Sequence, residues 1–487
     1  MSIETPSPEL FPAAGLLIGE RRVADATGGV HRHVYPGNGE ATLDVAMAGA
    51  AEIDAAVQAA RHALPGWKRL SPDKRRDLIL KFADLLQANG PALCQLAAAE
   101  NGMPVSKAAG HQWIAVDNFR YYAGWADKIG GEVIPTWPAQ GLDYTLREPY
   151  GVVGIIISWN APMALFSGGV APALAAGNTV VLKPSELAPF TSLRFGELLL
   201  EAGIPPGVVN IVPGGPAAGS ALVSHTGVDK IHFTGGGATA RAILDGARHN
   251  LTPVALELGG KSARIVFADG DIEAAVRDAI TGATSIAGQG CLLGTRVLVD
   301  DAIYEDFIAR CKAELEKVAL GDPAKAATQM GPVISAAASQ RIMGVIEQTQ
   351  RETSARLVTG GKRAGGALAN GYFIEPTLFA DVDNRSSLAQ NEVFGPVLSI
   401  LRFRSDEEAV QIANDSLYGL AAYLHTHDVR RAHRIAARLE VGNVWVNGTG
   451  FSPSIPFGGV KQSGFGRTGG LPGLEEFTKI KNIWIAN

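Results

Sequence analysis

From Gly151 onward the sequence alternates short apolar runs with amphipathic stretches, and this alternation constrains the fold more than any other feature. The apolar runs have the length of buried strands, and the stretches between them have the length and period of helices. The expected strands are 152–157, 178–182, 208–212 and 230–233, and the expected helices are 163–176, 191–202, 217–223 and 238–247. This pattern predicts a doubly wound parallel sheet in an α/β fold, with ligands at the carboxyl ends of its strands.

A second stretch of the same kind begins near Lys261. The expected elements are strands 263–267 and 296–299 and helices 272–286 and 304–318. We therefore expect a domain boundary at 257–261, and the 487 residues suit two or three domains.

The two ends of the chain carry weaker patterns. The first forty residues read as an irregular arm or small strands, and Ser71-Pro72 predicts the start of a helix. Residues 477–485 predict an exposed strand, of a kind that often pairs with another subunit.

Composition excludes several classes of protein. The 43 basic and 48 acidic residues give a net charge of −5 without a long basic run, so nucleic acid is not an expected partner. No signal-peptide pattern or bilayer-spanning apolar stretch is present, so no membrane association is expected. The 3 cysteines are too few for a disulfide framework. We expect a soluble, cytoplasmic protein.

Cys291 is the first candidate for chemistry, because it follows Gly288-Gln289-Gly290. Flanking glycines let a backbone approach a ligand closely, and a reactive thiol must be partly accessible. The same setting also suits a small buried cysteine. For Cys94 and Cys311, which lie in expected helices, packing or surface roles are favoured.

Two polar residues lie at expected strand ends. Glu257 stands among apolar residues in Leu256-Glu257-Leu258, where burial would raise its pKa towards that of a general base, although it could instead face solvent. Asn160 follows strand 152–157, and its amide could donate to a developing oxyanion or serve as a turn residue beside Pro162.

These signals combine into a known pattern. The chain closely resembles the aldehyde dehydrogenase superfamily from about Ala51 to Ile483. The segments that carry the resemblance are Trp159-Asn160, Lys183-Pro184-Ser185-Glu186, Phe233-Thr234-Gly235, Glu257-Leu258-Gly259-Gly260-Lys261-Ser262, Gly288-Gln289-Gly290-Cys291, Glu392-Val393-Phe394-Gly395-Pro396 and Pro456-Phe457-Gly458-Gly459-Val460-Lys461-Gln462-Ser463-Gly464.

The resemblance implies a catalytic role for three residues. Cys291 would attack an aldehyde carbonyl, and Asn160 would hold the oxyanion together with the Cys291 backbone N–H. Loss of a hydride to a nicotinamide would leave a thioester, and Glu257 would activate the water that hydrolyses it.

The resemblance also implies a variant Rossmann domain that binds NAD without a complete G-x-G-x-x-G, since Ala240 occupies the last glycine position. Lys183 and Glu186 would bind the adenosine ribose, and the Glu186 carboxylate would repel a 2′-phosphate, which favours NAD over NADP. Glu392 would hold the nicotinamide ribose, with Phe394 nearby. The full set of expected cofactor residues is Ile156, Ile157, Ser158, Trp159, Lys183, Ser185, Glu186, Gly215, Gly219, Phe233, Thr234, Gly235, Gly236, Thr239, Leu258, Glu392 and Phe394.

The family's domain plan carries over as well. It implies an NAD-binding domain over 1–130 and 150–258, a catalytic domain over 259–465, and a small β oligomerisation arm with a C-terminal tail over 131–149 and 466–487. A homodimer or homotetramer is expected.

The chain departs from the family pattern at a few sites. Gly236 stands where a serine is usual, so one phosphate contact is expected to be missing. Ser158 replaces the usual proline before Trp159, a change expected to affect only loop stiffness. Thr468 stands where many relatives carry a second acid, which leaves Glu257 as the main candidate base.

Small residues also stand where several relatives carry bulky aromatic groups along the aldehyde tunnel. The expected tunnel residues are Ala161, Leu165, Gly168, Ser285, Leu292 and Phe451, with Leu293 beside them. They predict a roomy apolar tunnel for aromatic, terpenoid or medium-chain aldehydes.

Two other functions compete with this prediction. A CoA-acylating relative would release its thioester to CoA, but such enzymes typically lack the glutamate that matches Glu257. A non-catalytic protein on the same fold would usually have lost the cysteine or the asparagine, and both are present here.

Overall fold

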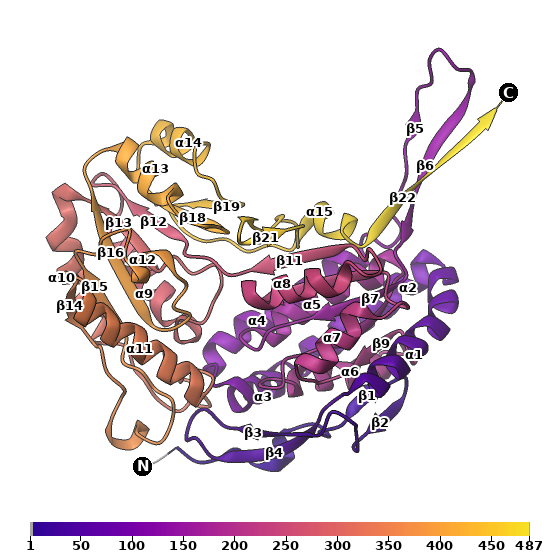
Figure 1. The fold of residues 1–487 in the computed structure, drawn as a ribbon, viewed down its shortest axis with the longest axis horizontal. Coiled ribbons are helices and arrows are strands. Elements are labelled where there is room, and N and C mark those ends of the chain that lie inside the picture. Colours follow the sequence, from indigo (N-terminus) through magenta and orange to yellow (C-terminus); the bar gives the residue numbers. More distant parts are fainter. Residues whose placement is uncertain (1–2, 487) are drawn as a thin grey trace.

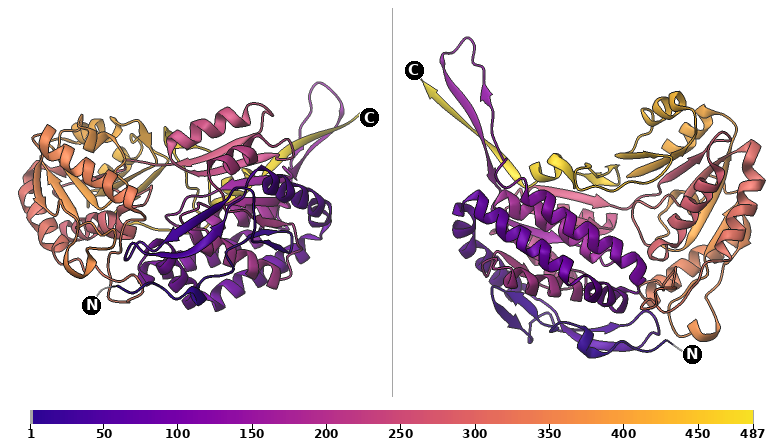
Figure 2. Two further views of the ribbon diagram at one scale, coloured as in Figure 1. Left: turned by 60° about the horizontal axis from the view of Figure 1, so that its bottom comes forward. Right: turned by 180° about the vertical axis from the view of Figure 1, so that it is seen from behind.

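The computed structural model describes residues 3–486 and has two lobes side by side, with a β-arm projecting from one of them (Figure 1). Each lobe is built around a large sheet, and the same division is visible from two other directions (Figure 2). Residues 1, 2 and 487, at the ends of the expected first domain and tail, lie outside the described residues.

The sheet of the first lobe has the strand order β2-β1-β9-β8-β7-β10-β11-β21. Its central strands β7 to β11 run parallel, as the alternating pattern predicts. Its edges differ from the prediction, because β1 runs antiparallel to β9 and β21 runs antiparallel to β11. The strands are β1 (Leu16–Ile18), β2 (Arg21–Val23), β7 (Val152–Ile156), β8 (Thr179–Lys183), β9 (Val209–Ile211), β10 (Lys230–Gly235), β11 (Val254–Leu258) and β21 (Gly464–Phe465).

Helices cover both faces of this sheet. Val153 and Ile155 of β7 face one core with α2 to α6, whereas Val152 and Ile156 face the other core with α1, α7 and α8. Burial on both faces explains why these strands read as continuous apolar runs. The helices are α1 (Ala50–Arg69), α2 (Pro72–Ala88), α3 (Gly90–Asn101), α4 (Val105–Ala123), α5 (Pro162–Ala176), α6 (Phe190–Glu201), α7 (Pro216–Ser224) and α8 (Gly237–Ala247).

The second lobe contains a sheet of order β14-β15-β16-β13-β12-β18-β19, in which only the β14–β15 pair is antiparallel. Its strands are β12 (Ala263–Val266), β13 (Arg296–Asp300), β14 (Arg356–Thr359), β15 (Thr377–Ala380), β16 (Val397–Phe403), β18 (Ala421–His425) and β19 (Asn443–Val446). Its helices are α9 (Ile272–Thr284), α10 (Tyr304–Leu315), α11 (Ala336–Glu352), α12 (Ser387–Gln390), α13 (Asp406–Asn414) and α14 (Val429–Ala436). The chain changes sheets between Leu258 and Ala263.

Two helix ends and one helix cap differ from the sequence prediction. The helix expected over 272–286 stops at Thr284, because Ile286 and Ala287 take left-handed backbone angles with φ of 47° and 52°. The helix expected over 304–318 stops at Leu315. Helix α2 begins at Pro72 as predicted, but the Ser71 side chain makes no capping hydrogen bond.

The arm consists of β5 (Val133–Ile134), β6 (Gly141–Pro149) and β22 (Thr478–Ala486). The predicted terminal strand forms as β22, but its partner in this chain is β6, with which it pairs antiparallel over its whole length. Because the sheet order is β22-β6-β5, β22 keeps one unpaired edge. This projecting edge is available to a further strand.

The remaining described elements are short. Strands β3 (Val30–Val34) and β4 (Ala41–Ala46) form a hairpin in the N-terminal segment, as expected for small strands there. β17 (Tyr418–Gly419) pairs with β20 (Val460–Lys461), and α15 (Gly470–Glu475) precedes β22. Within residues 3–486, no helix combines the length and the apolar character needed to cross a membrane.

Candidate active site

A cavity of about 310 Å³ brings the three candidate catalytic residues together. Asn160 reaches it from the loop after β7, Glu257 from β11, and Cys291 from the loop after α9. The rest of its wall is largely apolar and includes every residue expected in the tunnel: Ala161, Leu165, Gly168, Ser285, Leu292, Leu293 and Phe451. Side chains from both lobes therefore converge on one apolar chamber.

The Cys291 loop is held in an unusual backbone conformation. Ile286, Ala287 and Gly288 are left-handed in succession, a conformation that costs energy for residues other than glycine. A Cβ on Gly288 would lie 2.1 Å from the Gly395 carbonyl oxygen, so only glycine fits there. The Gln289 side chain ties the loop down by donating to the Ile286 carbonyl at 3.0 Å and accepting from the Ile334 N–H at 3.0 Å.

The Cys291 thiol is neutral in this environment. Burial raises its pKa to about 12, and the nearby carboxylates of Glu392 and Glu257 act in the same direction. A thiol in such a site becomes a nucleophile only when a base removes its proton or a positive charge lies close by.

Glu257 is a candidate base that lines the same cavity as Cys291. Its backbone lies between Thr234 of β10 and Gly464 of β21, and its side chain is buried. Burial raises its pKa well above 4.5; Arg467 opposes this shift and Glu476 adds to it. Its Oε2 atom is buried and has no hydrogen-bond partner among the described residues, and Glu257 itself lines the cavity.

Asn160 is held at both ends of its carboxamide. Its Nδ2 donates to the Gln289 carbonyl oxygen at 2.9 Å, and its Oδ1 accepts from the Ser158 hydroxyl at 2.7 Å. The loop backbone is fixed as well, because Asn101 Nδ2 donates to the Trp159 carbonyl at 3.0 Å. The Ser158 hydroxyl therefore contacts the candidate oxyanion donor, a contact that the sequence pattern did not predict.

The carboxyl ends of β8 and β10 carry the features of a dinucleotide site. Lys183 ends β8, and its Nζ donates to the carbonyls of Pro184, at 3.1 Å, and Gly214. Helices α7 and α8 begin after Gly215 and Gly236, and neither start has a side-chain cap. Backbone N–H groups at such helix starts are free to bind phosphate oxygens.

A second cavity of about 310 Å³ opens beside the start of α8. Leu258 and Glu392 line it, together with residues of the first turns of α8. The Glu392 carboxylate accepts from the Gly260 N–H at 3.2 Å, and burial raises its pKa to about 7. These features fit a dinucleotide. The uncapped helix starts could bind its phosphates, and the carboxylates of Glu186 and Glu392 could bind its ribose hydroxyls.

The other expected cofactor residues are distributed around these features. Ile156, Ile157 and Phe233 are buried in the sheet, and Thr239 is exposed on α8. Thr234 lines the Cys291 cavity rather than the second one.

The Trp159 ring lies edge-on to the Phe394 ring, with centroids 5.4 Å apart. Ser185 and Glu186 follow β8, Gly219 lies on α7, and Gly235 ends β10.

Sequence reasoning missed one wall of the Cys291 cavity. Helix α4 contributes His111, Trp113 and Asn118, and β10 contributes His232. These residues lie in ordinary amphipathic or strand patterns, so no local signal distinguishes them from surface or core residues.

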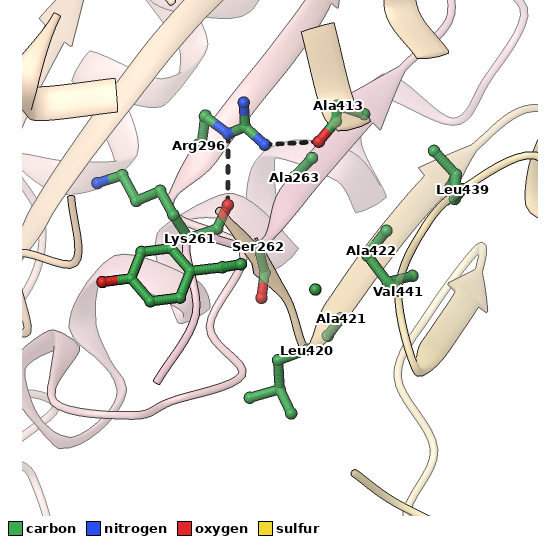
Figure 3. A pocket seen from close by; sticks show the side chains of 12 residues that line it. Lys261, Ser262, Ala263, Arg296, Ala413, Leu420, Ala421, Ala422, Leu439 and Val441 are labelled. Atoms are coloured by element: carbon green, nitrogen blue, oxygen red, sulfur yellow. Dashed lines mark hydrogen bonds between the residues drawn. The ribbon is translucent and has the colours of Figure 1, made fainter. Parts of the chain in front are cut away.

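A much smaller cavity in the second lobe is lined by Lys261, Arg296 and Ala413, among other residues (Figure 3). Arg296 donates to the carbonyls of Lys261 at 3.3 Å and Ala413 at 2.8 Å. At about 10 Å³ this space is too small for a substrate or a dinucleotide.

A cysteine, an amide donor and a buried carboxylate thus meet in one cavity, beside a parallel sheet whose strand ends lead into uncapped helix starts. Residues 23–483 match the family model described as "Aldehyde dehydrogenase family". The chain is 42% identical over 486 residues to an aldehyde dehydrogenase of Emericella nidulans, covering 99% of this chain and 97% of the relative.

Two further relatives agree. Human retinal dehydrogenase 2 is 40% identical, with 99% of this chain and 94% of the relative covered. A solved structure of betaine aldehyde dehydrogenase from Staphylococcus aureus in complex with NAD+ has a TM-score of 0.96 at 36% identity, covering 98% of this chain and 96% of that chain. The chain belongs to the aldehyde dehydrogenase family, and it is an oxidoreductase. The predicted family and fold are thereby confirmed.

Proposed function

We propose that this protein oxidises an apolar aldehyde to its carboxylic acid, with NAD as hydride acceptor, through a thioester on Cys291. The observation that carries the proposal is the meeting of Cys291, Asn160 and Glu257 in one largely apolar cavity. The substrate tunnel, the catalytic roles and the cofactor contacts are all part of the proposal.

In the first step the Cys291 sulfur attacks the aldehyde carbon. Because the thiol pKa is raised, its proton must pass to a base as the bond forms, and Glu257 is the group placed to take it. The carbonyl oxygen gains negative charge, which the free Nδ2 hydrogen of Asn160 and the Cys291 backbone N–H would stabilise.

The bound nicotinamide would accept the hydride that the thiohemiacetal carbon loses, which leaves a thioester. Glu257 first releases the thiol proton to solvent. It then takes a proton from water as the water oxygen adds to the thioester carbon. The carbon–sulfur bond breaks, the acid leaves, and Cys291 takes its proton from Glu257. The place of Glu257 in the cavity wall, with an Oε2 that has no hydrogen-bond partner among the described residues, supports this role.

Small side chains on the chamber wall support a bulky apolar substrate. Ala161, Gly168 and Ser285 leave room where a larger group would fill the cavity, and Leu165, Leu292 and Phe451 add apolar surface. Aromatic, terpenoid or medium-chain aldehydes fit these properties.

NAD is the proposed cofactor because the relevant groups lie at the carboxyl ends of β8 and β10. The NAD+ complex of the Staphylococcus aureus relative supports this choice. The Glu186 carboxylate next to Lys183 favours NAD over NADP, since it would repel a 2′-phosphate.

Three further properties are proposed on indirect grounds. Buried, unpaired Cys94 and Cys311 support a reducing compartment such as the cytoplasm. The projecting β-arm supports a homodimer or homotetramer. The change of sheet after Leu258 supports a boundary between NAD-binding and catalytic domains at 258/259.

A panel of aldehydes tested with NAD and with NADP, read by nicotinamide absorbance, tests the proposal. We expect the highest kcat/KM for benzaldehyde-like or eight-carbon aldehydes with NAD. A much higher kcat/KM for acetaldehyde or a charged semialdehyde would refute the substrate class, and a preference for NADP would refute the cofactor. CoA-dependent product formation would favour the acylating alternative.

A further inference from the structure

The hydrogen bonds around Asn160 fix which way its carboxamide points. The Gln289 carbonyl oxygen can only accept, so the atom 2.9 Å from it must be the Asn160 nitrogen. The other end of the carboxamide is then Oδ1, which also only accepts. The Ser158 oxygen, 2.7 Å from Oδ1, must therefore be the donor.

This arrangement leaves one hydrogen of Asn160 unassigned. The Nδ2 group carries two hydrogens, and the Gln289 carbonyl takes one of them. Asn160 lines the same cavity as the Cys291 thiol, so the second hydrogen is the one that can serve a ligand there. Without the Ser158 hydroxyl, Oδ1 would lose its only partner among the described residues, and the amide could rotate away.

We propose that Ser158 is a positioning residue, whose hydroxyl locks the Asn160 carboxamide with its free N–H directed at the oxyanion. The Ser158 hydroxyl and the Gln289 carbonyl form hydrogen bonds with opposite ends of the Asn160 amide. A single rotamer of Asn160 requires both bonds. This inference rests on the proposed function, because it assigns Ser158 a role through the oxyanion donor. It concerns the side chain of Ser158, which a proline at this position would not supply.

The step affected is formation of the thiohemiacetal. Carbonyl addition puts negative charge on oxygen, and a preorganised donor lowers its barrier more than a donor that must first rotate. Ser158 is expected to line the cofactor path through its backbone, which alanine retains, whereas its hydroxyl is bonded to Asn160. The effect of losing the hydroxyl therefore falls on kcat and on the acylation rate rather than on the affinity for NAD.

The test is a double-mutant cycle in the full-length protein. The rate of acylation in a single turnover is measured from the formation of NADH. We expect Ser158→Ala to slow acylation about fivefold, as for one neutral hydrogen bond. Asn160→Ala should slow it about 100-fold or more. Adding Ser158→Ala to Asn160→Ala should slow it less than about twofold further, because the group being positioned is gone.

Three controls complete the design. Ser158→Thr keeps the hydroxyl and should restore most of the rate. Ser192→Ala removes a buried hydroxyl on α6 that has no hydrogen-bond partner among the described residues, and should leave the rate unchanged. The Kd for NAD, measured by fluorescence titration, should stay the same in Ser158→Ala.

Several results would overturn the inference: an unchanged rate in Ser158→Ala, an equal loss in both backgrounds, or a loss explained by weaker NAD binding. If Asn160→Ala itself kept the full rate, the proposed oxyanion role would fail instead. The two failures are therefore distinguishable.

Discussion

Burial governs the protonation state of the active site. The pKa values of Cys291, Glu257 and Glu392 are all raised, in each case mainly by loss of solvent. The three acids lie near one another, so the negative charge of each carboxylate makes ionisation of the thiol harder. In the absence of ligand, burial disfavours the ionised form of all three groups, so the proposed mechanism requires a proton transfer as the sulfur attacks.

The raised pKa of Glu257 predicts how turnover depends on pH. Under the proposed mechanism Glu257 acts as a base only when ionised, and burial raises its pKa well above 4.5, so kcat should rise with pH over a range above that of an ordinary carboxylate. In Glu257→Gln that rise should disappear and kcat should fall about 100-fold or more. Steady-state rates over a pH series check this, and a wild-type kcat that is flat from pH 5 upward would contradict it.

At the scale of elements, the sequence predicted the parallel strands and their order along the chain. Burial on both faces makes β7 and β8 continuous apolar runs, which are easily recognised. The antiparallel edges were missed, because β1 and β21 are short and pair with strands that are distant in sequence. Pairing of this kind leaves no local pattern.

Motifs in the sequence indicated the candidate catalytic residues but not their hydrogen-bond partners. Ser158 and Gln289 lie 131 residues apart in sequence numbering yet hold the same carboxamide. The left-handed Ile286 was predicted as the last residue of a helix, because isoleucine rarely takes that conformation. At Asn160 and in the Cys291 loop, contacts between distant parts of the chain decide the conformation, and local sequence preference does not.

The Cys291 loop gives a prediction at this scale. In Gly288→Ala the new Cβ would meet the Gly395 carbonyl at 2.1 Å in a left-handed conformation. We expect a loss of about 3 kcal/mol in unfolding free energy and an activity loss of about 100-fold, because the thiol shifts. Thermal denaturation and steady-state kinetics measure both effects.

Gly344→Ala is the matched control for that variant. Gly344 lies within α11, where a Cβ meets nothing within 4 Å, so alanine should leave activity unchanged and raise stability slightly. Wild-type activity and stability in Gly288→Ala would show that the loop is not constrained as described.

At the scale of the whole molecule, the arm of β5, β6 and β22 projects away from both lobes (Figure 1). It carries exposed apolar side chains, including Trp137 at 90% and Ile480 at 64% exposure. A projecting apolar edge strand in a single chain favours aggregation unless another chain covers it.

We therefore predict that substitutions on β22 change the assembly state. The double variant Ile480→Asp, Trp484→Asp should shift the protein to a smaller oligomer, measured by size-exclusion chromatography with light scattering. Val429→Asp, at an equally exposed apolar position on α14, should not. A monomeric wild-type protein would contradict the proposed assembly.

The central claim is that aldehyde oxidation passes through a thioester on Cys291 that Glu257 resolves. It is tested most directly by mixing Glu257→Gln with NAD and octanal, quenching the mixture and analysing peptides by mass spectrometry. We predict an octanoyl group on Cys291, formed with about one NADH per site, and none on Cys94 or Cys311. A burst of NADH without any acyl group on Cys291, or acylation of another residue, would contradict the account.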